Sequence, residues 1–164
     1  MAVVQSQGIE KGEITYQIRA DQEAGKLGGA RLRIAGRGIG APNAGPGAAA
    51  YAGVGYEVTT EDQARKAVQE LAAKKVNLVR IWVDDRNGRA PRLASNLFTA
   101  IIDEGHKHGL QVNAHVFYYT DAVDLVNAGI DALVHLVRDT EMDDALVTAV
   151  GRRMSTSCPI SPPR

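Results

Sequence analysis

Two histidines occupy equivalent positions in consecutive strand-like segments of this 164-residue chain. His115 lies near the end of segment 110–116, and His135 lies near the end of segment 130–136. The C-terminal ends of parallel strands carry the functional groups of α/β folds, and neutral imidazole is the commonest metal ligand. The repeat therefore favours a metal site. The alternative is a pair of core histidines whose rings hydrogen-bond to backbone carbonyls.

Charged residues follow two of the expected strands. Asp84 and Asp85 end one strand, and Arg138 with Asp139 follows the second histidine. Side chains at these positions can contact a substrate or support a metal ligand. The alternative is local: the aspartates cap the next loop, and Asp84 or Asp85 pairs with Arg86.

Composition bounds the class of protein. Lysine plus arginine equals aspartate plus glutamate, so the net charge of zero argues against nucleic-acid and anionic-membrane partners. No apolar run approaches the roughly 18 residues of a membrane span, and no signal peptide is visible. We therefore expect a cytoplasmic protein of a single domain. Cys158 is the only cysteine, which excludes an intrachain disulfide, and we expect it to be a buried thiol.

Helical and strand-like segments alternate along the chain, which predicts βαβ units and a parallel sheet. Thr60 and Gln63 form a capping-box pattern at the start of one helix. A glycine-rich segment, 36–56, lacks the spacing of a dinucleotide-binding loop and is expected to lie over the site. The expected helices are 13–24, 60–72, 94–108, 120–127 and 141–150, and the expected strands are 30–35, 76–83, 110–116 and 130–136, with a possible short strand within 154–160.

The strands have one apolar face and one polar face, because side chains alternate along a strand. Val79, Ile81 and Val83 oppose Arg80 and Trp82, and the histidine strands repeat this pattern. An inner strand of a doubly wound sheet is apolar on both faces. The pattern therefore predicts helices on the apolar face only and a barrel interior on the polar face. An open sheet with a solvated polar face is the alternative.

Five segments resemble the amidohydrolase superfamily, in particular its imidazolonepropionase-like and prolidase-like hydrolases. The segments are 59–71, 79–86 (VRIWVDDR), 101–109 (IIDEGHKHG), 114–117 (AHVF) and 134–139 (VHLVRD), and the resemblance covers about 13–150. It implies a (β/α)₈ barrel that hydrolyses amide, cyclic amide or dipeptide bonds. It also implies one or two divalent metals, zinc above all, that activate a water molecule.

The resemblance assigns His115 and His135 to the metal histidines of the family's fifth and sixth strands. The His-x-His pair of the first strand has no counterpart, because His106 and His108 share its spacing but lie at the end of a helix. The aspartate of the eighth strand would lie beyond the last residue. Arg80 stands where many members carry a carboxylated lysine, and arginine cannot form that bridge.

We therefore expect an α/β fold, a partial (β/α)₈ TIM-type barrel with about four to five parallel strands and helices on its outer face. Residues 1–164 would form one incomplete domain, with 151–164 as an irregular tail or truncated strand. No complete catalytic set is present, so metal binding should be weak or absent and the isolated chain inactive. The parent enzyme would act on a small amide or dipeptide.

Two further expectations follow from an incomplete barrel. Edge strands near 31–35 and 154–160 would stay open and could support self-association. The rival function, from another class, is a non-catalytic α/β module that binds a ligand or partner at its strand ends.

Overall fold

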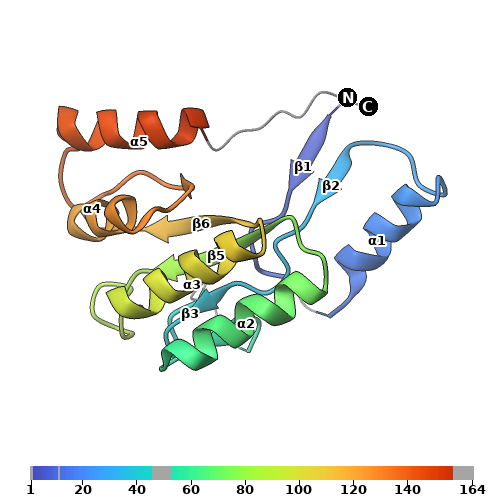
Figure 1. Cartoon of the computed structure of the whole chain (residues 1–164), viewed down its shortest axis with the longest axis horizontal. Coiled ribbons are helices and arrows are strands. Elements are labelled where there is room, and N and C mark those ends of the chain that lie inside the picture. Colours follow the sequence, from blue (N-terminus) through green and yellow to red (C-terminus); the bar gives the residue numbers. More distant parts are fainter. Residues whose placement is uncertain (1, 11, 46–52, 157–164) are drawn as a thin grey trace.

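The computed structural model describes residues 2–10, 12–45 and 53–156. Five strands form a parallel sheet in the order β4-β3-β5-β6-β7, and two N-terminal strands form a separate parallel pair, β1-β2. Figure 1 shows α2 and α3 side by side along the sheet, with α4 and α5 at one end and α1 at the other. The elements are β1 Val3–Gln5, α1 Ile14–Glu23, β2 Arg31–Arg33, β3 Ile39–Gly40, β4 Tyr56–Glu57, α2 Glu61–Ala73, β5 Leu78–Val83, α3 Ser95–Lys107, β6 Gln111–Val116, α4 Tyr119–Ala128, β7 Ala132–Leu133 and α5 Asp144–Thr156.

One apolar core holds the helices against the sheet. All six residues of β5 are buried, and its alternate residues Val79, Ile81 and Val83 belong to this core. Helices α2, α3, α4 and α5 all contribute side chains to the same cluster. The helices therefore cover one face of the sheet, as the strand pattern predicts.

The opposite face of the central strands is polar. Arg80 pairs in register with Asn113, and Trp82 pairs with His115, so these side chains share a face. The segment after β1 crosses this face and approaches it closely at Gly8. A Cβ atom on Gly8 would lie 2.8 Å from Cβ of Arg80, and its φ of 84° also favours glycine.

The sheet confirms the predicted fold class. Its strand order has the pattern of a flavodoxin-like sheet, but such a sheet carries helices on both faces. Here helices α2, α3, α4 and α5 pack into one core on one face, which is the arrangement of part of a (β/α)₈ barrel. Among these residues the sheet does not close on itself.

The helix starts agree with the sequence in part. Thr60 caps α2 by accepting a hydrogen bond from the backbone N–H of Gln63, while the Gln63 side chain accepts one from the N–H of Thr59 instead of Thr60. Helix α4 begins at Tyr119, so Thr120 lies within it. Helix α5 begins later than expected, and Asp143 instead of Thr140 accepts a hydrogen bond from its first turn.

The chain ends differ from the expectations in two respects. The strand expected at 31–35 is β2, Arg31–Arg33, which pairs in parallel with β1, a partner that the sequence pattern did not predict, and β2 remains an edge strand of this two-stranded sheet. Residues 151–156 belong to α5, so they are neither an irregular tail nor a strand. Residues 157–164, with Cys158, lie outside the described residues. No helix within the described part of the chain has both the length and the apolar character to cross a membrane.

Gly38 offers a test of how the polar face is packed. A Cβ atom at this position would overlap the Trp82 ring, 1.9 Å from Cζ3. Gly38→Ala should therefore lower the free energy of unfolding by about 1–3 kcal/mol, the usual cost of overpacking. Urea denaturation followed by Trp82 fluorescence measures this change.

Gly28→Ala is the matched control, because a Cβ atom there would have no neighbour within 4 Å among the described residues, and the φ of Gly28 is not left-handed. A Gly38→Ala variant as stable as the Gly28→Ala variant would contradict the close contact with Trp82.

Candidate functional site

A cavity of about 420 Å³ lies on the polar face, toward the C-terminal ends of β5 and β6. Both histidines of the sequence prediction line it, together with Arg80, Asp84 and Arg138. The complete lining is Gln7, Ile9, Gly45, Arg80, Trp82, Asp84, Arg86, His115, His135 and Arg138.

The two imidazoles lie in contact. The ring centroids of His115 and His135 are 4.8 Å apart at an interplanar angle of 80°, an edge-to-face arrangement. His115 is on β6, whereas His135 lies two residues beyond the end of β7 and is exposed. The structure therefore brings together the two histidines that the sequence pattern pairs.

Asp84 connects the ends of β5 and β6. Its Oδ2 lies 2.9 Å from Nε2 of His115, and its Oδ1 accepts a hydrogen bond of 2.7 Å from the backbone N–H of Arg86. Arg86 and Asn87 both have φ near 57°, an uncommon conformation for residues with side chains. The hydrogen bond from Arg86 stabilises this turn and directs Asp84 toward His115.

Both histidines have pKa values below 6.5. Burial is the main cause of the lowered pKa of His115, and the charges of Arg80 and His135 add to it, while Asp84 opposes it. For His135, which is exposed, the partial desolvation of its ring is the first cause, and the charges of Arg80 and Arg138 contribute. Neutral imidazoles therefore prevail at pH 7.

Arg80 is the buried cation of this cavity. Only 3% of the residue is exposed, and its Nη1 donates a hydrogen bond of 3.2 Å to the side chain of Gln7. Burial lowers its pKa to about 10, so the guanidinium is still charged at pH 7. Its Nε is enclosed and has no hydrogen-bond partner among the described residues.

Asp85 and Asp139 do not line the cavity. Asp85 accepts hydrogen bonds from the hydroxyl of Tyr118 at 2.8 Å and from Nε of Arg92 at 3.1 Å, and the Tyr118 bond is the main cause of its lowered pKa. Asp139 accepts a hydrogen bond from the backbone N–H of Tyr119, at the start of α4. Both aspartates thus hold loops together at the edge of the site.

The residues of the cavity do not fit a divalent metal. Two imidazoles supply only half of a tetrahedral shell, and Arg80 and Arg138 add positive charge beside them. Over residues 2–10, 12–45 and 53–156, no group of three or more histidine, cysteine, aspartate or glutamate side chains is arranged to hold a metal ion. His106 and His108 lie apart from the cavity, near Asp131 and Glu104 respectively.

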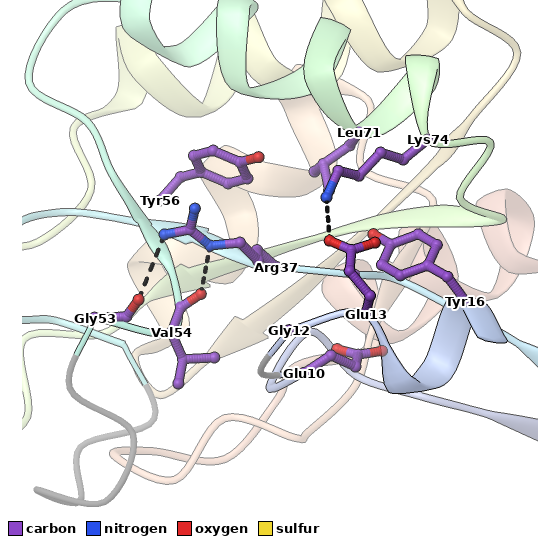
Figure 2. Close-up of a pocket in the computed structure, with 11 residues that line it drawn as sticks. Glu10, Gly12, Glu13, Tyr16, Arg37, Gly53, Val54, Tyr56, Leu71 and Lys74 are labelled. Atoms are coloured by element: carbon purple, nitrogen blue, oxygen red, sulfur yellow. Dashed lines mark hydrogen bonds and ion pairs between the residues drawn. The ribbon is translucent and has the colours of Figure 1, made fainter. Parts of the chain in front are cut away.

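A second cavity of about 350 Å³ lies between α1 and α2 and shares no residue with the first. Figure 2 shows Lys74 in contact with Glu13 and Arg37 in contact with Gly53 and Val54, whereas Glu10 has no contact drawn. Nζ of Lys74 lies 2.7 Å from the Glu13 carboxylate. The guanidinium of Arg37 lies 4.2 Å from the centre of the Tyr56 ring and donates to the carbonyl oxygen of Val54. These contacts connect elements, so we place the functional site in the first cavity.

Five lining residues were not among the candidates from the sequence: Gln7, Ile9, Gly45, Trp82 and Arg86. Trp82 could have been found, because it shares the strand face of Arg80. Gln7 follows β1, a strand of three residues that is too short for periodicity to reveal.

No family model matches the chain. An uncharacterised protein of Mycobacterium tuberculosis is 39% identical over 88 residues, which cover 51% of this chain and 24% of the relative. A protein of Mycobacterium bovis matches equally well. The matched region thus spans about a quarter of the length of these relatives.

Solved structures of several hydrolases have the same fold. A Xaa-Pro dipeptidase with methionine in its active site superposes with a TM-score of 0.74 at 19% identity, over 93% of this chain and 40% of the dipeptidase. A prolidase in complex with N-methylphosphonate-L-proline gives 0.73 at 18% identity, and a molinate hydrolase gives 0.72 at 17%. Each superposition covers 93% of this chain and 40% of the other. At these identities the similarity establishes the fold.

The contact between Asp84 and His115 predicts a pH dependence. His115 binds a proton less readily in the folded chain than in the unfolded chain, so the free energy of unfolding should decrease as the pH falls below about 6.5. Asp84→Asn removes the charge that favours the imidazolium and should lower the pKa of His115 further. NMR titration of the ring protons measures both pKa values.

Asp103→Asn is the matched control, because it removes an equal charge from an exposed side chain that pairs with Arg65. A rise in the pKa of His115 in Asp84→Asn, or an equal change in both variants, would contradict the assigned contact.

The possible metal ligands of the cavity, His115 and His135, also predict how the chain responds to zinc. The purified chain should retain far less than one zinc ion per molecule after dialysis, because Arg80 repels a cation beside only two imidazoles. Elemental analysis by mass spectrometry checks this. A content near one zinc per chain would mean that other groups complete a site around His115 and His135.

Proposed function

We propose that this chain is a segment of an amidohydrolase-type barrel that hydrolyses a C–N bond, and that the isolated chain is not hydrolytic. The observation that carries the proposal is the cavity at the ends of β5 and β6, where His115 and His135 meet beside Asp84. Active sites of such barrels lie at this end of the strands.

The solved neighbours support the class of substrate. One is named as a Xaa-Pro dipeptidase and another as a prolidase. By this analogy, the complete protein would act on a small amide or dipeptide.

The chain's own residues have limited roles in that reaction. Asp84 orients His115 through the contact at Nε2, and the neutral imidazoles of His115 and His135 can accept or donate a hydrogen bond to a substrate. Among the described residues, no hydroxyl or thiol side chain lines the cavity beside either histidine. The described sheet is also open at β4 and β7, so the remaining wall of the site is missing from these residues.

The buried Arg80 favours a second candidate, a non-catalytic module that binds a small ligand in the same cavity. A guanidinium on the polar face is suited to recognising an anion and unsuited to a metal site. The two candidates differ in whether any substrate is cleaved.

A chimeric barrel separates the two candidates. This chain would replace the 40% of the Xaa-Pro dipeptidase that it superposes on, and hydrolysis of proline dipeptides, acyl-amino acids and cyclic amides would be followed by amine release. We expect turnover by the chimera and none by the isolated chain. Because Arg80 disfavours a metal ion beside the histidines, the chimera should be slower than its Arg80→Lys variant if the site uses two metals, and should match it if the site uses one.

Two outcomes would contradict the proposal. A folded chimera that lacks activity, or whose activity survives His115→Ala and His135→Ala, would remove the hydrolase assignment. Turnover by the unmodified chain that is abolished by His115→Ala would show that the isolated chain is competent.

Arg80→Lys tests whether arginine at this position is the only defect. In the isolated chain we expect this variant to give no turnover of the same substrates. The variant still lacks counterparts of the family's His-x-His pair on the first strand and of its aspartate on the eighth strand. Turnover above the background of a His115→Ala, Arg80→Lys double variant would show that the lysine alone restores the site.

A further inference from the structure

We propose that Arg80 makes the polar-face cavity a binding site for a small carboxylate, with the carboxylate as counter-ion of the buried guanidinium. The site is the same cavity at the ends of β5 and β6 that carries the proposed function. The inference rests on the proposed function only where it gives this cavity a role in catalysis. Binding to the isolated chain does not depend on any hydrolytic activity.

The first argument is the missing counter-charge. Arg80 is 3% exposed and lines the cavity, yet the only hydrogen bond of its guanidinium among the described residues goes to the neutral side chain of Gln7. No carboxylate within the described ranges forms an ion pair with it. A buried charge without a partner is costly, so a cation kept at this position indicates that its partner comes from outside the chain.

Glu104 is a second buried charged residue, and its hydrogen-bond and ion-pair partners can be compared with those of Arg80. This residue is 6% exposed and lies 3.5 Å from Nη1 of Arg65 and 3.3 Å from Nζ of Lys107. It also accepts a hydrogen bond of 2.8 Å from Gln69. The carboxylate is thus surrounded by donors from the chain itself, whereas Arg80 has one neutral acceptor.

The charge balance of the cavity favours an anion. Three arginines line it against the single carboxylate of Asp84, which already accepts hydrogen bonds from His115 and from the turn after β5. His135 forms no hydrogen bond among the described residues, and its ring N–H is available as a second donor.

Geometry favours a carboxylate over a phosphate. A guanidinium presents a planar fork that matches a carboxylate, and Arg80 is the single deep cation of the cavity. Asp84 in the same wall would repel a dianion more strongly than a monoanion. The cavity of about 420 Å³ is also large enough for a small aromatic or aliphatic acid.

The test uses the full 164-residue chain and the fluorescence of Trp82. Trp82 is the only tryptophan and lines the cavity, so a nitroaromatic ligand bound there should quench its emission. The probe is 4-nitrobenzoate, and its neutral isostere 4-nitrobenzamide is the matched ligand control. We expect saturable quenching by the acid, at least tenfold weaker binding of the amide, and competition by acetate that inorganic phosphate and chloride do not reproduce at equal ionic strength.

Arg80→Met removes the guanidinium and keeps an unbranched side chain of similar reach. We expect it to weaken 4-nitrobenzoate binding at least tenfold without lowering the midpoint of thermal unfolding, because it removes a buried charge. Arg89→Gln removes an exposed arginine that does not line the cavity, and it should bind the probe as the parent chain does.

Equal binding of the acid and the amide would overturn the proposal, as would no saturable binding or equal competition by phosphate. Unchanged affinity in Arg80→Met would overturn it as well. A lower unfolding midpoint in Arg80→Met would assign Arg80 to the structure instead of the ligand. The activity of the chimeric barrel does not affect these binding results. The hydrolase proposal and the carboxylate-binding proposal can therefore be contradicted independently of each other.

Discussion

The alternation of side chains along β5 and β6 is the constraint on which the rest of the structure depends. These neighbouring strands pair along their whole length, and each places apolar side chains on one face and polar side chains on the other. Helices α2 and α3 can bury only the apolar face. The polar face must therefore be covered by other parts of the chain or form a site. In this chain the segment after β1 covers part of the polar face, and the C-terminal ends of the strands form a cavity on it.

The same alternation separates two adjacent aspartates. Asp84 lies on the polar face beside His115, whereas Asp85 is directed away from the cavity to Tyr118 and Arg92. The guanidinium of Arg92 in turn lies 3.8 Å from the centre of the Tyr118 ring. One carboxylate thus belongs to the site, and the next one connects the loop after β5 to the start of α4.

Charge sets what the cavity can hold. In a hydrolase barrel of the type that the sequence resembles, a lysine at the position of Arg80 would support a metal centre. Arginine keeps its proton even when burial lowers its pKa to about 10. A fixed positive charge on the polar face disfavours a metal cation and favours an anion.

The sequence by itself determined the long elements, the two faces of the sheet and the pairing of His115 with His135. These features depend on periodicity within a segment, which local side-chain order encodes directly. The tertiary structure alone decided the short elements and the complete lining of the cavity. Strands β3 and β4 have two residues each, β7 keeps only Ala132–Leu133 of the expected strand 130–136, and β1 pairs with a partner 28 positions away, from Val3 to Arg31. Gln7 reaches Arg80 only because that pairing directs the chain across the polar face, and contacts between distant segments leave no periodic signal in the sequence.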